Sequence, residues 1–347
     1  MGKVVIEEIR FDDGEKMKRF QVKGFGDLDI SILDYGLTME TLRYKGVNRV
    51  LSLKDPKAYR NNKHYVGATI GRVAGRLSKA LIKIDGRGYP LDKNEGKQCL
   101  HGGTMGFSNR TWKYLGSCKL EEGKESEKLR LDFALFSPEG EGGFPGNLEV
   151  RASFSIDKKG LLRIEYFAKS DQKTPVTFTN HSYFNLNTEK GKTIENHDLK
   201  IHSKEYLQLN HWKLPKTFRW VKKSPFDFQE KKNLGIRLHQ LNKQGYDGID
   251  HPFIFTKDDR VLELICAPCK TALRIHSTEP CVVVYTGNQL QDDVEFEKGV
   301  MGRRYLGICL ETQWFPNAIN TDFLPDNFLL PNEVYYSKTD YKFMDFD

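Results

Sequence analysis

Hydrophobic and polar residues alternate with a period of two over much of the chain. In residues 148–156 (LEVRASFSI), every second position from Leu148 to Ile156 is apolar, and the intervening positions carry Glu, Arg and Ser. The same pattern occurs in residues 128–136 (KLRLDFALF) and 161–170 (LLRIEYFAKS). Because successive side chains of a strand point to opposite faces, this alternation indicates half-buried antiparallel strands.

Further segments with strand character are separated by turns rich in Gly and Asn. They are residues 27–33 (DLDISIL), 281–288 (CVVVYTGN), 305–313 (YLGICLETQ) and 333–343 (EVYYSKTDYKF). Helical spacing is sparse, and only residues 230–241 (EKKNLGIRLHQL) place leucines on one helical face. No linker or repeat of fixed length interrupts the chain. The sequence therefore predicts a mainly β fold, a large antiparallel β-sandwich with very few short helices, and residues 1–347 as a single domain.

A histidine lies within the alternating segment TPVTFTNHSYFNL, residues 174–186. If the first eight of these residues form one strand, His181 shares a face with Thr177 and Thr179, away from the apolar face. This segment alone leaves two interpretations open: a catalytic histidine, or a histidine whose hydrogen bonds the threonines satisfy. Asn180 also begins a glycosylation sequon, which is used only on the secretory route.

Two arginines and a second histidine stand in segments that are otherwise apolar or rich in glycine. In residues 68–80 (ATIGRVAGRLSKA), Arg72 and Arg76 have a spacing that also resembles a helical face. Each arginine is either a structural ion-pair partner or a planar donor to ligand oxygens. His101, in residues 99–107 (CLHGGTMGF), precedes two glycines. Such glycines let the backbone approach a ligand closely, or simply make a tight turn.

Carboxylates stand out in two segments. Glu311 follows the apolar run GICL, and burying a carboxylate is costly unless it is paired or its pKa rises. It is therefore either half of a buried ion pair or a general base with a raised pKa. In residues 245–253 (GYDGIDHPF), Asp247, Asp250 and His251 have a spacing that suits a metal site, but the neighbouring Gly and Pro favour a loop with self-capping Asp side chains.

Composition and charge narrow the function classes. The 347 residues include 54 Lys+Arg and 47 Asp+Glu, a formal net charge of +7, with both signs dispersed along the chain. A nucleic-acid binder gathers its cations on one element, so no nucleic-acid partner is expected. No apolar run is long enough for a membrane helix, and the charged N-terminal residues lack a signal-peptide core. We therefore expect a cytoplasmic protein with no membrane partner, in which the sequon at Asn180 is not used.

Motifs for metals, nucleotides and nucleophilic serines are weak or missing. Cys266 and Cys269 (CAPC) have redox or zinc spacing, and His276 follows, but three possible ligands without a fourth make a weak site. The sequence contains no GxxxxGK[ST] or GxGxxG phosphate loop after a strand and no GxSxG elbow. No metal and no organic cofactor is expected.

Taken in order, seven segments resemble the aldose 1-epimerases, and specifically the animal galactose mutarotases. They are IGRVAGR, LHGG, SPEGEGGFPGNLEV, TPVTFTNHSYFNL, DHPF, YTGNQL and GICLETQWFPNAIN, within residues 70–320. The resemblance implies the large antiparallel supersandwich of that family, in agreement with the period-two pattern. For the assembly we expect a monomer or a weak dimer.

The resemblance implies a shared mechanism for His181 and Glu311. Members of the family interconvert the α and β anomers of free aldohexoses such as galactose and glucose, without metal or organic cofactor. By position, Glu311 is implied as the base that takes the anomeric hydroxyl proton, and His181 as the acid that protonates the ring oxygen. His101 is implied to polarise the ring oxygen, and Arg76 and Asp250 to bind sugar hydroxyls.

Two positions depart from the family pattern. Gly75 stands where Asn is usual, and Val283 stands where the animal members usually carry Gln. Each change removes a hydrogen bond worth ~0.5–1.5 kcal/mol, so we expect activity to survive with weaker binding or relaxed selectivity. Two alternatives stay open: a non-catalytic sugar-binding or sensor protein on the same fold, and a hexose-6-phosphate 1-epimerase, which requires added Lys or Arg over the pocket.

Overall fold

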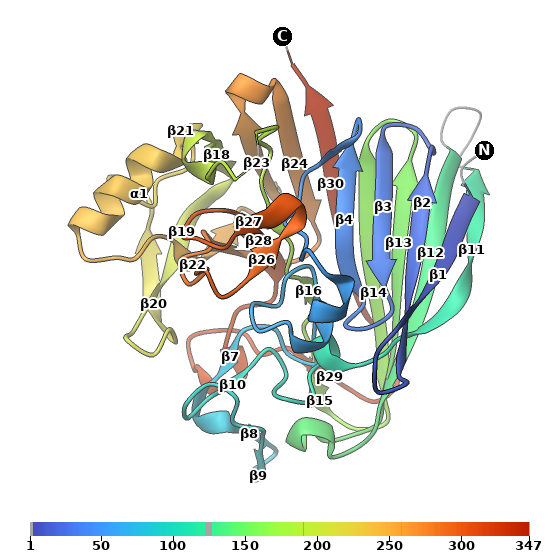
Figure 1. Cartoon of the computed structure of the whole chain (residues 1–347). Helices are drawn as coiled ribbons and strands as arrows, with labels where there is room; N and C mark the ends of the chain where they lie inside the picture. The colour runs from blue at the N-terminus through green and yellow to red at the C-terminus, as the bar shows by residue number, and fades with distance from the viewer. Residues whose placement is uncertain (1–2, 122–126, 190, 258, 347) are drawn as a thin grey trace.

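A nine-stranded antiparallel sheet lies behind the other sheets in the view of Figure 1. The computed structural model describes residues 3–121, 127–189, 191–257 and 259–346. In order across the sheet, the strands are β11 (Lys113–Glu121), β12 (Glu127–Ser137), β13 (Leu148–Asp157), β14 (Leu161–Ser170), β30 (Tyr335–Asp345), β24 (Thr271–Ser277), β23 (Val261–Cys266), β18 (Asp198–Ile201) and β21 (Lys232–Asn233). The alternating segments predicted from the sequence form β12, β13, β14 and β30, and their apolar faces are buried.

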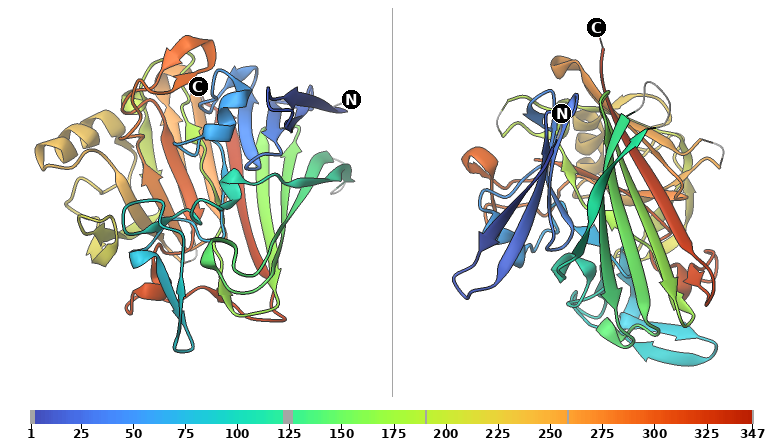
Figure 2. Two further views of the ribbon diagram at one scale, coloured as in Figure 1. Left: turned by 60° about the horizontal axis from the view of Figure 1, so that its bottom comes forward. Right: turned by 90° about the vertical axis from the view of Figure 1, so that its right-hand side faces the viewer.

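Two smaller antiparallel sheets pack against this large sheet, so that the fold has the layers of a sandwich (Figures 1 and 2). The five-stranded sheet contains β1 (Lys3–Arg10), β2 (Lys16–Lys23), β3 (Leu28–Leu33), β4 (Thr38–Tyr44) and β5 (Val47–Asn48). The six-stranded sheet has the order β17 (Tyr183–Phe184), β28 (Ile308–Gln313), β25 (Cys281–Tyr285), β22 (Asp250–Phe255), β19 (Ser203–Leu209) and β20 (Pro215–Trp220). The predicted mainly β, antiparallel sandwich is confirmed.

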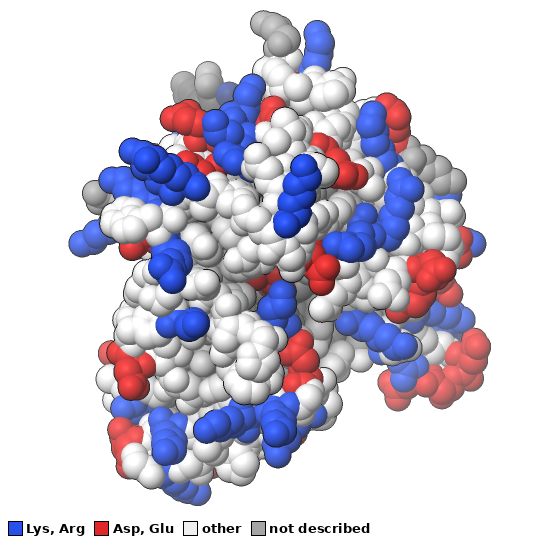
Figure 3. All heavy atoms as spheres, turned by 90° about the vertical axis from the view of Figure 1, so that its left-hand side faces the viewer, with Lys and Arg blue, Asp and Glu red and all other residues white. Residues whose placement is uncertain are grey.

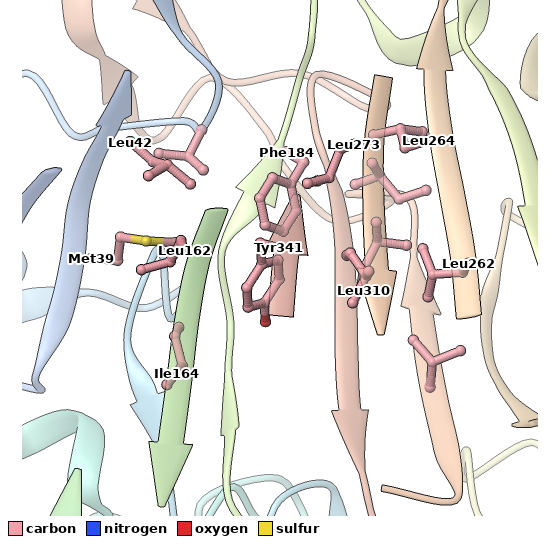
Figure 4. Packing of buried hydrophobic residues seen from close by; sticks show 14 of the residues in the cluster. Met39, Leu42, Leu162, Ile164, Phe184, Leu262, Leu264, Leu273, Leu310 and Tyr341 are labelled. Atoms are coloured by element: carbon pink, nitrogen blue, oxygen red, sulfur yellow. The ribbon is translucent and has the colours of Figure 1, made fainter. Parts of the chain in front are cut away.

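The main core lies between these layers. Met39 of β4 meets Leu162 of β14 between the five- and nine-stranded sheets (Figure 4). Leu310 of β28 belongs to the same buried cluster as Leu262 and Leu264 of β23. Because strand residues alternate between faces, a core-facing Leu310 turns its neighbour Glu311 to the opposite side of the six-stranded sheet.

One α-helix occurs among the described residues, and it is the predicted one. Helix α1 (Leu234–Lys243) buries Leu234, Leu238 and Leu241. The side chain of Asn233 caps its N-terminus by accepting a hydrogen bond from the backbone N–H of Ile236. None of the helices in the described part of the chain is long and apolar enough to span a bilayer.

Five short two-stranded ladders complete the strand pairing of the described residues. They are β6 (Thr69–Ile70) with β16 (Thr179–Asn180), β7 (Arg76–Leu77) with β10 (Cys99–Leu100), β8 (Leu81–Ile84) with β9 (Arg87–Pro90), β15 (Thr174–Pro175) with β29 (Phe328–Leu329), and β26 (Glu295–Phe296) with β27 (Val300–Met301). On the face drawn in Figure 3, Lys and Arg side chains lie interspersed with Asp and Glu, as the dispersed charge of the sequence predicts.

Two local predictions are wrong. The strand expected over residues 174–181 is broken into β15 and β16, because the backbone between them crosses to other partners: Thr177 N–H donates to the carbonyl of Arg72. The helical spacing in residues 68–80 does not correspond to an α-helix. Instead the segment forms β6 and β7 with a turn between them, in which Gly75 has a φ of +79° that an α-helix does not allow.

Candidate active site

A cavity of about 280 Å³ is lined by the six-stranded sheet, the β7–β10 ladder and neighbouring irregular segments. Its wall includes all the residues that the family resemblance assigns to the site or marks as departures from it: Gly75, Arg76, His101, His181, Asp250, Val283 and Glu311. These residues come from widely separated parts of the chain, namely β7 and its preceding turn, the segments after β10 and β16, and strands β22, β25 and β28. The fold therefore gathers them into one place.

Glu311 reaches the cavity because β28 turns alternate residues toward it. The side chain is 3 % exposed, and its Oε2 atom accepts no hydrogen bond from the described residues. Burial, assisted by the negative charge of Asp250 and opposed by Arg76, raises the pKa of Glu311 to about 8. The free carboxyl group is thus held in its protonated form near neutral pH, with one oxygen available to a ligand.

His181 faces Glu311 directly. Its Nε2 atom lies 3.6 Å from Oε1 of Glu311, and its Nδ1 atom lies 3.5 Å from the Sγ of Cys309. The backbone N–H of His181 donates to the carbonyl of Ala68, which fixes where the side chain begins. Burial lowers the pKa of His181 to about 4. The ring nitrogens therefore face Glu311 and Cys309, and the hypothesis that threonines satisfy them is wrong.

His101 is held by a reciprocal pair of hydrogen bonds with Gly75. The backbone N–H of His101 donates to the Gly75 carbonyl at 3.0 Å, and the Gly75 N–H donates to Nδ1 of His101 at 3.1 Å. Burial lowers the pKa of His101 well below its usual range, so the ring is neutral. A neutral imidazole that accepts at Nδ1 carries its hydrogen on Nε2, and His101 is therefore a hydrogen-bond donor through Nε2.

This tautomer bears on metal binding. His101, His181 and Glu311 each offer one ligand atom, and these three atoms lie within 4.8 Å of one another. Histidine nitrogens and a carboxylate oxygen grouped in this way can hold a zinc ion. A metal requires a free nitrogen lone pair, however, and the Nδ1 lone pair of His101 is engaged by Gly75 while its Nε2 carries the hydrogen. The trio does not fit a metal, and its chemistry is that of proton donors and acceptors.

The two arginines have different surroundings. Arg76 enters the cavity and is held in a bidentate ion pair with Glu95, with N–O distances of 2.6 and 2.7 Å. Arg72 points away, and its guanidinium donates to the hydroxyl and carbonyl of Ser137 and to the carbonyls of Pro138 and Pro145. Arg72 is therefore structural, whereas Arg76 presents its remaining N–H groups to the cavity.

Together with Pro252, Asp250 of the cluster GYDGIDHPF lines the cavity. It begins strand β22, so the interpretation of this position as part of a self-capping loop is wrong, and its Oδ2 lies 3.5 Å from Nζ of Lys213. Asp247 instead lies 3.7 Å from Arg304, and His251 is packed among the rings of Tyr206, Phe226 and Tyr246. The three residues are thus dispersed rather than gathered around an ion.

The two departures from the family pattern also lie in the wall. A Cβ atom at Gly75 would lie 3.1 Å from Cβ of Pro316 and 3.5 Å from Nε2 of Gln313. Val283 faces Glu311 across the β25–β28 ladder. Gly75 therefore contributes to the site through its backbone, and Val283 supplies an apolar surface next to the buried carboxyl group.

Several wall residues were missed from the sequence. The rings of Tyr65, Tyr183 and Tyr285 surround His181 at centroid distances of 5.8, 5.2 and 6.4 Å. The period-two rule was a usable signal for Tyr285, which follows Val283 by two positions on β25 and points the same way. For Tyr65 no such signal exists, because it lies in an irregular segment.

The CAPC motif lies elsewhere in the fold. Cys266 ends β23, and the sulfurs of Cys266 and Cys269 lie 3.8 and 3.9 Å from the side-chain oxygen of Asn187. Neither cysteine lines the cavity, and both are free thiols.

Comparison with known proteins agrees with this architecture. Residues 18–342 match the family model described as aldose 1-epimerase. Galactose mutarotase from Sus scrofa is 32% identical over 334 residues, 93% of each chain, and aldose 1-epimerase from Escherichia coli (strain K12) is 29% identical over 351 residues, 96% of each chain. Galactose 1-epimerase from Lactobacillus acidophilus NCFM superposes with a TM-score of 0.85 at 27% identity, covering 100% of both chains. An aldose epimerase homologue from C. elegans, at 24% identity and a TM-score of 0.81, has the same fold.

Proposed function

Because the chain belongs to the aldose 1-epimerase family, we propose that it interconverts the α and β anomers of free aldohexoses such as galactose and glucose, with His181 and Glu311 as its acid and base. The observation that carries the assignment of residues is the 3.6 Å approach of His181 Nε2 to Glu311 Oε1 inside the cavity. Two groups that exchange a proton with one substrate must both lie within reach of it.

The reaction is a redistribution of protons around the anomeric carbon. Glu311 takes the proton of the O1 hydroxyl, the electron pair of that bond forms the C1–O1 double bond, and the C1–O5 bond breaks. O5 keeps the electron pair of the broken bond and receives the proton of His181. Rotation about C1–C2 then presents the other face of the aldehyde, and ring closure reverses the two proton transfers. Nothing is oxidised or reduced.

The opposed pKa shifts suit this exchange. With the pKa of His181 lowered to about 4 and that of Glu311 raised to about 8, the pair holds a single exchangeable proton over the intervening pH range. In the free enzyme the proton lies on Glu311. A sugar hydroxyl that donates to the carboxylate favours the ionised form, and the proton then moves to His181, from which ring opening begins.

The remaining wall residues bind and orient the sugar. His101 donates from Nε2 toward the ring oxygen, whose developing negative charge this hydrogen bond stabilises. Arg76 donates to sugar hydroxyls, with its fork held in place by Glu95, and Asp250 accepts from a hydroxyl beside Lys213. Lost side-chain hydrogen bonds at Gly75 and Val283 relax the choice between galactose and glucose without touching the acid or the base.

Polarimetry of freshly dissolved α-galactose tests the proposal. The wild-type protein accelerates the approach to anomeric equilibrium, and His181→Asn or Glu311→Gln lowers kcat by roughly 10²–10⁴-fold. Matched controls are His197→Asn and Glu279→Gln, which alter a buried histidine and a buried carboxyl group that lie outside the cavity wall. Folded controls keep the wild-type rate. A wild-type protein that gains thermal stability with galactose yet leaves the spontaneous rate unchanged would instead be a sugar-binding protein.

A further inference from the structure

The imidazole of His181 is contacted by two residues of the same strand. Cys309 and Glu311 lie two positions apart on β28, so they point to the same side of the sheet. The Sγ atom of Cys309 is 3.5 Å from Nδ1, and Oε1 of Glu311 is 3.6 Å from Nε2. One ring nitrogen therefore meets the proposed base, and the other meets a thiol that the mechanism above does not use.

We propose that Cys309 is a positioning residue, whose sulfur accepts the Nδ1 hydrogen of His181 and so reserves Nε2 for proton exchange with the sugar. This inference rests on the proposed function of His181. Cys309 is completely buried and does not line the cavity, so it acts on the sugar only through the histidine.

The catalytic cycle requires that the same nitrogen of His181, Nε2, gives the proton and takes it back. When the imidazolium gives its Nε2 proton to the ring oxygen, the neutral ring that remains carries its hydrogen on Nδ1, with a lone pair on Nε2 ready to take the proton back. A partner that accepts from Nδ1 in both states keeps that tautomer and the ring orientation unchanged. Without such a partner the neutral ring is free to place its hydrogen on Nε2, where it blocks the return transfer.

The thiol is oriented for the accepting role. The Tyr183 hydroxyl interacts with the same sulfur and donates its own hydrogen to the carbonyl of His64 at 3.0 Å. Because His64 engages that hydroxyl hydrogen, the tyrosine oxygen has lone pairs with which to accept the S–H of Cys309, and such a bond would leave the sulfur lone pairs for Nδ1. The hydrogen bonds then run in one direction, from His181 through Cys309 and Tyr183 to His64.

A neutral acceptor also suits the charge of the site. Burial raises the pKa of the Cys309 thiol well above its usual range, so the sulfur stays uncharged. A carboxylate at the same place would stabilise the imidazolium and slow the release of its proton. The titratable and charged groups around the His181 ring are Glu311, Cys309, Tyr65, Tyr183, Tyr285, His101, His64, Arg76 and Asp250.

Selectively ¹⁵N-labelled histidine tests the inference directly. In the free wild-type enzyme at neutral pH, the nitrogen shifts of His181 should report the tautomer with hydrogen on Nδ1, and Cys309→Ala should mix the two tautomers. The Nε2–H tautomer in the wild-type protein would overturn the proposal. Because the spectrum does not depend on turnover, it separates failure of this inference from failure of the proposed function.

Kinetic measurements on variants of Cys309 provide a second test. Cys309→Ala should lower kcat for galactose roughly threefold to tenfold, as the loss of one hydrogen bond predicts, while KM stays unchanged. Cys309→Ser restores an acceptor and should recover most of kcat. Cys281→Ala is the matched control, because Cys281 is equally buried on the neighbouring strand β25 and contacts no histidine ring in the described structure. Equal losses of kcat in Cys309→Ala, Cys309→Ser and Cys281→Ala would show a packing effect alone and refute the positioning role.

Discussion

The buried carboxyl group of Glu311 makes the stability of the protein depend on pH in a way that Glu311→Gln should abolish. Its pKa is raised from 4.5 to about 8, chiefly by burial, whereas the unfolded chain returns it to its ordinary value. For a group whose folded-state pKa is raised, the contribution to stability is fully present below the unfolded pKa and is lost as the pH rises through the folded pKa. The free energy of unfolding therefore falls with increasing pH.

The size of the effect follows from proton linkage. The folded state binds about one more proton at Glu311 than the unfolded state near pH 6.5 and about half a proton more at pH 8, which corresponds to a slope that falls from about 1.4 to about 0.7 kcal/mol per pH unit. Over this interval the wild-type protein should lose about 2 kcal/mol through Glu311. The buried histidines have lowered pKa values, so the unfolded state binds more protons at these residues until the pH passes their unfolded pKa of about 6.5. This opposite contribution reaches into the lower part of the interval, but it is common to the wild type and Glu311→Gln and cancels in their comparison.

Urea unfolding of the wild-type protein and of Glu311→Gln at several pH values measures this difference. The glutamine side chain stays neutral, so the variant should gain about 2 kcal/mol relative to the wild type as the pH rises from 6.5 to 8. Glu279, whose pKa burial raises to about 7, is common to both proteins and cancels in the comparison. Parallel stability curves for the two proteins would refute the raised pKa, and with it the single shared proton on which the proposed mechanism depends.

Three further outcomes are expected. The pH profile of kcat/KM for galactose should be flat between limbs near pH 4 and pH 8, since the pair then holds one proton; a rate that keeps rising above pH 8 would contradict this assignment. Gly75→Ala should lower the free energy of unfolding, measured by thermal unfolding, by about 1–2 kcal/mol because Gly75 has a φ of +79°. Gly75→Asn should lower it less, since Asn tolerates that conformation. Equal losses of stability would count against backbone strain as the cause. Arg72→Leu should lower the free energy of unfolding in urea by about 3 kcal/mol and leave KM for galactose unchanged. Arg76→Leu should raise KM. A raised KM in the Arg72 variant would mean that this arginine is not purely structural.

Much of the sheet was predictable because strand alternation is a local property. Each stretch such as residues 148–156 carries its own period-two pattern, and the pattern persists when the strand joins a sheet. For Glu311 the sequence indicated burial from the apolar run before it, and the structure confirms that burial. The break in residues 174–181 was not predictable, because it depends on which distant segments pair with each half.

What the sequence determined by itself was the class of fold and the residue types available for acid–base chemistry, since these depend on side-chain identity and local spacing. Local spacing did not distinguish Arg76 from Arg72 or Asp250 from Asp247; the family resemblance implied one of each pair, and the tertiary structure places that residue in the cavity. Arg76 enters it and Arg72 is buried elsewhere, and Asp250 lines it while Asp247 does not. It also brought the thiol of Cys309 to Nδ1 of His181 across 128 positions of sequence. The physical reason is that these choices depend on contacts between strands far apart in the chain, which local periodicity does not encode.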